Sequence, residues 1–263
     1  MYCDIITHIN SRNGGFFMEI RYFREYSNHL HRFMEHKIIG TDGIMCYVFP
    51  CQNGRYFEWE DRGMFDLVNI LIEQGHIQFC TVDSIDVETI SAHGHDADRF
   101  LRHEQWVSYI MEELIPSSLR NAKLPLDSKC MTTGCSLGAY HALNLFLRFP
   151  DRFNKVLGMS GLYDIELYFG TLQNEITYLN NPVMYLANMP MDHPYIKKYN
   201  KGQIILSVGQ GSYEDLCKET LRRVSTIFKE KGIDAWCDFW GYDVHHDWCW
   251  WQLMLQYFLP QMV

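Results

Sequence analysis

Short apolar runs alternate along the chain with segments whose apolar residues recur every three to four positions. The first pattern is typical of buried strands and the second of amphipathic helices. Their alternation predicts an α/β fold, with a mostly parallel sheet and helices on both faces. Predicted strands lie at 18–23 and 31–39, as an antiparallel pair, and at 44–49, 77–82, 129–133, 155–159, 204–208 and 235–240; predicted helices lie at 63–74, 97–114 and 249–259.

The stretch 163–200 departs from this alternation. It mixes several tyrosines and methionines with three prolines, and it is too long for an ordinary connection and too aromatic for a disordered linker. We expect a cap-like excursion over a binding site. The alternative is an irregular packed loop without a role in binding.

No repeat, low-complexity tract or linker divides the 263 residues. With 47% hydrophobic and 21% charged residues, the chain is too apolar to be disordered. At this length one α/β domain can bury a substantial core without disulfides or metals. We therefore expect a single domain over residues 1–263, with the excursion inside it.

The balance of charged residues indicates which classes of binding partner are unfavourable. Against 23 Lys and Arg stand 32 Asp and Glu, and the net charge of −9 argues against binding nucleic acid through its phosphates. The mean hydropathy is −0.21 and no apolar run approaches 18 residues, so we expect no membrane association. A small-molecule substrate fits this composition, and whether the protein forms a homo-oligomer stays open.

The cysteines indicate a reducing compartment. Their number, nine, is odd, no two form a C-x-x-C pair, and several lie in apolar runs. Cys46 and Cys51 have no second pair at matching spacing, so we expect no zinc site. Residues 1–8 lack the pattern of a secretory signal. Together these features predict a cytoplasmic protein.

The stretch 130–143 carries the clearest chemical signal. It contains G-x-S-x-G, formed by Gly134, Ser136 and Gly138, between a strand pattern and a helix pattern. Such a nucleophile elbow holds the serine on a strained turn, and the flanking glycines remove Cβ atoms that would clash there. The serine then lies at a helix N-terminus, whose dipole favours developing negative charge. We predict Ser136 as a nucleophile.

A nucleophilic serine needs a base, which follows it in this fold in the order serine, acid, histidine. His141 lies inside the helix after the elbow and is better explained by packing, and His193 lies in the excursion. His245 and His246 follow the last predicted strand, in a loop that would return to the carboxyl edge of the sheet. The base is therefore expected at His245 or His246.

Residues 242–251, with the order His246-Asp247-Trp248 followed three residues later by Trp251, are similar to the G-H-D-W-x-x-W signature of the family called Putative esterase. This family of α/β-hydrolases includes esterase D, feruloyl esterases and enterochelin esterases. The stretches 50–63, 134–138 and 159–164 add to the resemblance. It implies an α/β-hydrolase fold and a base at His246; because His245 stands where the family has glycine, His245 remains the alternative.

The acid of the triad should follow the strand at 204–208. Members of the family often carry G-x-x-D there, and Gly211 to Glu214 has this spacing with Glu in place of Asp. The resemblance thus points to Glu214, with Asp215 as the alternative acid. A helix N-terminus would also explain acidic residues at this place, without any part in catalysis.

Backbone N–H groups should form the oxyanion hole. One belongs to Leu137, the residue after the nucleophile, and the other lies in the loop after the strand at 44–49. This loop lacks the H-G-G-G run of lipases. The second donor is therefore expected at Cys51 or Gln52.

These residues predict a serine carboxylesterase that hydrolyses a small-molecule ester through an acyl-enzyme on Ser136, His246 and Glu214, without metal or organic cofactor. The alternatives are an acyltransferase or thioesterase that uses the same triad, and a non-catalytic binding protein on a hydrolase scaffold. Acetylated sugars, feruloyl esters, S-formylglutathione and small peptides or lipids are all candidate substrates.

Overall fold

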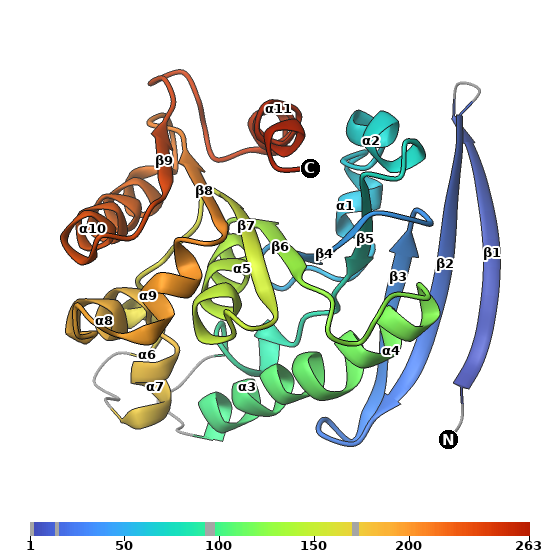
Figure 1. Ribbon diagram of the computed structural model, residues 1–263, viewed down its shortest axis with the longest axis horizontal. Coiled ribbons are helices and arrows are strands. Elements are labelled where there is room, and N and C mark those ends of the chain that lie inside the picture. Colours follow the sequence, from blue (N-terminus) through green and yellow to red (C-terminus); the bar gives the residue numbers. More distant parts are fainter. Residues whose placement is uncertain (1–2, 14–15, 93–97, 170–173) are drawn as a thin grey trace.

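A nine-stranded sheet forms the centre of the computed structural model, which describes residues 3–13, 16–92, 98–169 and 174–263; for residues 3–13 and 16–17 it describes the backbone only (Figure 1). The strand order is β1-β2-β3-β5-β4-β6-β7-β8-β9. Strands β1, β2, β3 and β5 pair antiparallel in turn, and the pairs from β5 through β4 to β9 are parallel. The strands are β1 (Cys3–Asn13), β2 (Phe16–Ser27), β3 (Arg32–Ile39), β4 (Ile44–Phe49), β5 (Ile77–Thr81), β6 (Cys130–Cys135), β7 (Phe153–Met159), β8 (Gln203–Val208) and β9 (Trp236–Phe239).

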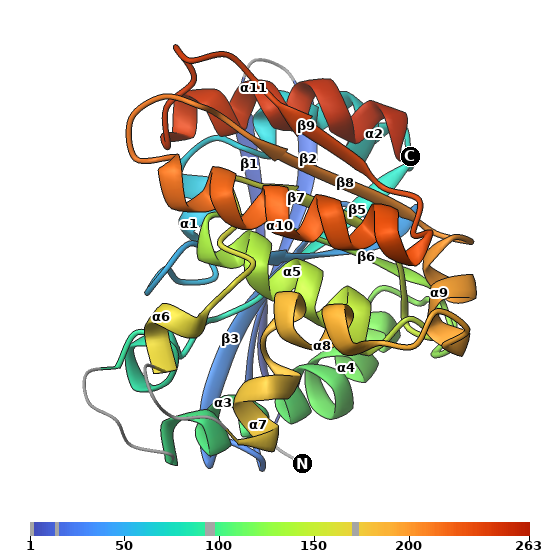
Figure 2. The same ribbon diagram turned by 90° about the vertical axis from the view of Figure 1, so that its left-hand side faces the viewer.

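Helices cover both faces of the sheet, as the alternating pattern predicted (Figures 1 and 2). One face is covered by α1 (Glu58–Asp61), α2 (Asn69–Glu73) and α11 (Trp248–Phe258), and the other by α3 (Asp98–Ser108), α4 (Ile115–Asn121), α5 (Leu137–Arg148) and α10 (Asp215–Lys231). Residues on β4 alternate between the two apolar cores: Tyr47 belongs to one and Val48 to the other. The predicted fold class is confirmed.

Two predicted helices differ from the structure. The segment 63–74 consists of a 3₁₀ turn (Asp66–Val68) followed by α2, since the backbone leaves helical geometry at Val68. The prediction that the helix at 97–114 ends before Pro116 was wrong. A π-helical turn (Tyr109–Leu114) precedes α4, which carries Pro116 in its first turn, where the missing N–H costs little. The predicted start of this helix, Ala97, lies outside the described residues.

The described parts of the excursion, 163–169 and 174–200, hold four short helices: α6 (Glu166–Phe169), α7 (Glu175–Leu179), α8 (Pro182–Asn188) and α9 (Pro194–Tyr199). Figure 2 shows α7 and α8 beside α3 and α5, on one face of the sheet. Near its start, the Tyr168 hydroxyl donates to Gln52 Oε1 at 2.9 Å. A cap over the binding site stays a prediction, and Tyr168 is the contact that favours it. Of the helices in the described ranges, none has the length and apolar character needed to span a bilayer.

His36 on β3 makes the stability of the fold sensitive to acid. Its ring is 1% exposed and stacks on Phe23 with 4.9 Å between centroids, and among the described residues neither ring nitrogen finds a partner. Burial lowers the pKa of His36 to about 3. The native state therefore holds this ring neutral, whereas the unfolded chain takes up a proton below about pH 6.5, so stability is lost as the pH falls from 6.5 towards 3.

We expect His36→Phe to lower this acid sensitivity. Between pH 7 and pH 5, the unfolding free energy of the wild type should fall by about 2 kcal/mol more than that of the variant. Urea unfolding at the two pH values measures both losses. Equal losses would show that His36 does not titrate on unfolding.

Candidate active site

Ser136 lies on a strained turn between β6 and α5. Its φ is 55° and its ψ −125°, a conformation that a non-glycine residue adopts only where the surroundings enforce it. A Cβ on Gly134 would lie 2.4 Å from the carbonyl carbon of Gly138, and a Cβ on Gly138 would lie 2.3 Å from the Phe49 oxygen. The G-x-S-x-G glycines are thus required by the close approach of α5 to β6 and β4. This turn has the geometry predicted for a nucleophile elbow.

His246 lies within hydrogen-bonding distance of the serine. It comes from the loop between β9 and α11, and its Nε2 is 2.9 Å from Ser136 Oγ. The backbone N–H of His246 donates to Ser212 O at 3.0 Å, which ties this loop to the one after β8. His245 points elsewhere: its side chain is exposed and its Nδ1 accepts the Ser212 N–H at 2.9 Å.

Glu214 lies on the other side of the imidazole. Its Oε2 is 3.2 Å from His246 Nδ1, and the residue is completely buried at the start of α10. The side chain of Asp215, in contrast, is 87% exposed and pairs with Lys218 at 2.9 Å. The structure therefore brings Ser136, His246 and Glu214 together and leaves Asp215 outside. Their roles as nucleophile, base and acid stay predictions.

Two further residues, which the sequence analysis did not assign to the site, hold the Glu214 carboxylate in place. Ser160, directly after β7, donates its hydroxyl to Glu214 Oε1, and the indole of Trp251 donates to Ser160 Oγ at 3.0 Å. The Trp251 ring also packs edge-on against His246, with 4.9 Å between centroids. Both residues lie in the stretches that resemble the esterase family, so the sequence carried a signal for them but not their contacts.

The loop after β4 faces the elbow, since Gly138 approaches Phe49 closely. In this loop the N–H of Cys51 donates to Glu58 Oε2 at 2.7 Å, so this N–H already has a partner. Burial raises the pKa of Glu58 even though the carboxylate accepts that bond. Of the two expected positions, Gln52 is the one whose side chain Tyr168 holds. Leu137 begins α5 directly after Ser136.

The remaining histidines of the expected set lie away from Ser136. His141 on α5 is buried and its Nε2 is 2.9 Å from Asp86 Oδ1, so besides packing it makes a buried side-chain hydrogen bond. His193 precedes α9, where its Nδ1 accepts the N–H of Tyr195. It also lines a cavity of about 470 Å³ with Leu147 and Arg148, at the end of α5 far from Ser136. This cavity is therefore not the site of the proposed chemistry.

A second cavity, of about 390 Å³, lies between the segment after β7 and helix α10. It is bounded by Leu162 and Asp164, which follow Ser160, and by residues of α10 that follow Glu214. Asp164 pairs with Arg223 at its wall, with 2.6 Å between Oδ2 and Nη1. A cavity of this size has room for part of a small ligand, although Glu214 itself does not line it.

A mostly parallel sheet with a serine on the strand-to-helix turn, and a histidine and a carboxylate after later strands, defines an α/β-hydrolase. Within this class, residues 35–262 match the model of the family described as Putative esterase. The chain belongs to that family, and it is a carboxylic ester hydrolase. The resemblance inferred from residues 134–138 and 242–251 is confirmed.

Solved structures share this fold over nearly the whole chain. A ferulic acid esterase matches with a TM-score of 0.74 and 16% identity, over 93% of this chain and 97% of that one. An S-formylglutathione hydrolase from Agrobacterium tumefaciens matches with a TM-score of 0.72 and 14% identity, over 97% and 98%. The fluorophosphonate-binding serine hydrolase F of Staphylococcus aureus matches with a TM-score of 0.68 and 12% identity, over 92% and 97%. No curated protein sequence matches the chain.

Proposed function

We propose that the protein hydrolyses a small-molecule carboxylic ester through an acyl-enzyme on Ser136. The observation that carries the proposal is the continuous chain of contacts from Ser136 Oγ to His246 Nε2 and from His246 Nδ1 to Glu214 Oε2. A serine hydroxyl becomes a competent nucleophile only when a base can take its proton, and a base is most effective when its other nitrogen is held by a carboxylate.

In the first half of the reaction, Ser136 Oγ attacks the ester carbonyl while His246 Nε2 takes its proton. Glu214 accepts the Nδ1–H and stabilises the imidazolium, which then gives the proton to the leaving alcohol. In the second half, water attacks the acyl-enzyme and His246 again serves first as base and then as acid. Ser160 donates to the far oxygen of Glu214 and fixes the orientation of the carboxylate.

The negative charge on the carbonyl oxygen falls at the N-terminus of α5. We propose the Leu137 N–H as one donor and the Gln52 N–H as the other, because the Cys51 N–H is taken by Glu58. Glu58 then acts as a positioning residue that holds the loop after β4. Tyr168 restrains the same loop through the Gln52 side chain.

Ser160→Ala should lower kcat about 10- to 100-fold with little change in KM, since a hydrogen bond to a charged group contributes ~1.5–3 kcal/mol. Ser207→Ala is the matched control, because Ser207 is also a buried serine at the carboxyl end of a neighbouring strand but donates to Met254 Sδ. Initial rates on p-nitrophenyl acetate measure both variants. Equal losses in the two variants would mean that Ser160 acts only through stability.

The ester is proposed to be small and soluble, in a cytoplasmic setting. The eight cysteines whose side chains are described are all free thiols, which supports a reducing compartment, and the net charge of −9 opposes nucleic acid as a partner. Acyl transfer and thioester hydrolysis use the same chain of residues, so the acceptor and the leaving group decide between them.

The proposed function is tested with a fluorophosphonate and with a substrate panel. The probe should form one covalent adduct, which peptide mass spectrometry locates at Ser136. The panel contains p-nitrophenyl esters from acetate to decanoate, methyl ferulate and S-formylglutathione. Turnover of at least one substrate together with labelling of Ser136 supports the proposal. A protein that neither labels nor turns over any substrate is a binding protein on a hydrolase scaffold.

A further inference from the structure

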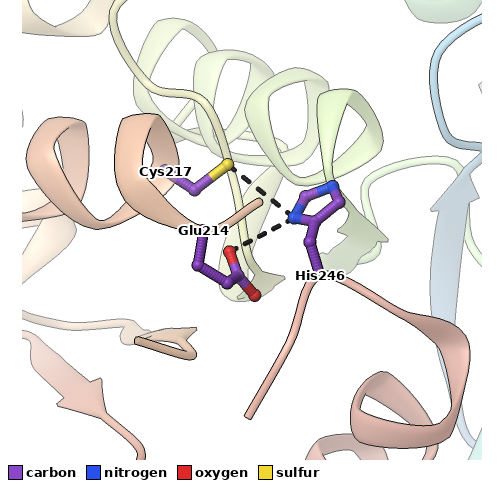
Figure 3. A group of neighbouring side chains, drawn as sticks. All are labelled: Glu214, Cys217 and His246. Atoms are coloured by element: carbon purple, nitrogen blue, oxygen red, sulfur yellow. Dashed lines mark hydrogen bonds and ion pairs between the residues drawn. The ribbon is translucent and has the colours of Figure 1, made fainter. Parts of the chain in front are cut away.

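Cys217 lies against the imidazole of His246 on the side of the acid. It stands on α10 three residues after Glu214, and its Sγ is 4.0 Å from His246 Nδ1. Figure 3 shows the sulfur and a Glu214 oxygen converging on this nitrogen. The three atoms, one from each residue, lie within 4.8 Å of one another. The mechanism uses Glu214 and His246 but gives the thiol no part.

We propose that Glu214, Cys217 and His246 form a binding site for a zinc-like divalent cation, and that its occupation switches the enzyme off. Carboxylate, thiolate and imidazole are the ligands of tetrahedral zinc sites, in which water can take the fourth position. The loss of activity rests on the proposed function, whereas the cation site itself does not.

The distances fit such a site. With Zn–N and Zn–O bonds of about 2.0–2.2 Å, a tetrahedral cation places the two ligand atoms about 3.3–3.5 Å apart, and with a Zn–S bond of about 2.3 Å it places sulfur and nitrogen about 3.6 Å apart. The Nδ1 to Oε2 distance is 3.2 Å and the Nδ1 to Sγ distance is 4.0 Å. The third pair, Cys217 Sγ and a Glu214 carboxylate oxygen, lies within 4.8 Å, so a side-chain movement that shifts the sulfur by about 1 Å towards the other two atoms closes the site.

The protons and charges also balance. Burial, together with the neighbouring Glu214, raises the pKa of the Cys217 thiol, so the thiol keeps its proton until a cation replaces it. Binding releases this proton to solvent, and the Nδ1 proton is exchanged through solvent for one on Nε2. One proton is released in total. The two negative ligands then neutralise the cation, which suits a buried site.

The bound cation would block catalysis through the tautomer of His246. Nδ1 gives its lone pair to the cation, so Nε2 must carry the remaining ring proton and can no longer accept one from Ser136. Glu214 is at the same time withdrawn from the imidazolium. The cation binds at Nδ1, on the opposite side of the imidazole ring from Ser136, so inhibition should lower kcat and leave KM nearly unchanged.

The donor set predicts which cations act. Thiolate and imidazole favour Zn²⁺ and Cd²⁺, whereas Mg²⁺ prefers oxygen ligands in octahedral geometry. Micromolar Zn²⁺ or Cd²⁺ should inhibit, a chelator should restore activity, and Mg²⁺ should have no effect.

Binding is tested first without activity, by titrating the intact protein with Cd²⁺ and recording the ultraviolet charge-transfer absorption of a cadmium thiolate. The wild type and Ser136→Ala should show the same saturable band, since Ser136 is not a ligand. Cys217→Ala should lose it, and Glu214→Gln should bind at least about tenfold more weakly. Cys249→Ser is the matched control, because it removes an exposed thiol on α11 and should keep the band.

Inhibition is tested within each variant, as the ratio of ester turnover with and without Zn²⁺. Cys217→Ala should raise the inhibitory concentration at least about tenfold relative to wild type, and Cys249→Ser should not. Cys217→Ser serves in place of Cys217→Ala if the latter fails to fold, because it keeps a small polar side chain and removes the soft sulfur ligand. A Cd²⁺ band that persists in Cys217→Ala would overturn the proposal. If that persisting band is then lost in Cys51→Ala, the cation binds in the loop after β4 instead. If the protein hydrolyses no ester, the Cd²⁺ titration still decides whether the site exists.

Discussion

Replacing Ser136 by alanine should lower kcat by about four to six orders of magnitude while leaving the fold intact. The substitution removes one oxygen atom, whose hydrogen-bonding partner is His246 Nε2, and triad residues act as a unit, so that loss of the nucleophile costs about as much as loss of the whole set. Single-turnover assays on an activated ester measure the residual rate. Thermal unfolding of the variant should match that of the wild type to within a few degrees.

The neighbouring thiol provides the control for this prediction. Cys135 precedes Ser136, is completely buried, and burial raises the pKa of its thiol, so it is a poor nucleophile. Cys135→Ala should keep activity within a few-fold of wild type. Turnover of Ser136→Ala at a tenth of the wild-type rate would place the nucleophile elsewhere.

Glu214→Gln should lower kcat by several orders of magnitude near neutral pH, and Asp215→Asn should stay within a few-fold of wild type. The Glu214 carboxylate is completely buried and lies 3.2 Å from His246 Nδ1, so its loss leaves the imidazolium without a counter-charge and frees the ring to adopt the wrong tautomer. Asp215 is mostly exposed and contributes about 0.3–1 kcal/mol to the N-terminus of α10.

The two substitutions are matched, because each converts the carboxylate of one of two adjacent acidic residues into a carboxamide of nearly the same size. Steady-state kinetics on one p-nitrophenyl ester measure kcat and KM for both. A severe loss in Asp215→Asn with a mild one in Glu214→Gln would reverse the assignment of the acid. Similar mild effects in both would mean that the base works without a carboxylate partner.

Local patterns predicted most of the sheet. Strands β4 to β8 are short, mostly apolar runs, which are recognisable because both faces of a buried strand contact the core. Strands β2 and β3 instead alternate apolar with polar residues, the pattern of a strand with one solvated face. The strand β1 lacks this pattern and was missed. The helix through Pro116 was missed because the π-helical turn at Tyr109–Leu114 that admits the proline has no sequence signature of its own.

For the active site too, the sequence identified some residues and only the structure could identify the others. The G-x-S-x-G motif pointed to Ser136 because a strained turn demands glycine on both sides, a requirement that is local. The choice of base between His245 and His246 rested only on the resemblance to the esterase family, because both residues lie in the same loop. Glu214 and Asp215 are adjacent in the sequence. The direction in which α10 begins decides that Glu214 is buried and Asp215 exposed.

The sequence by itself determined the fold class, the nucleophile turn and the esterase family, because each of these depends on residues that are close together along the chain. Only the tertiary structure decided which acid contacts the base, that Ser160 and Trp251 hold this acid, and that Cys217 lies beside the imidazole. These contacts join residues that lie up to 91 positions apart. Their distances follow from how β7, β8 and the last loop meet at one edge of the sheet, which no local pattern encodes.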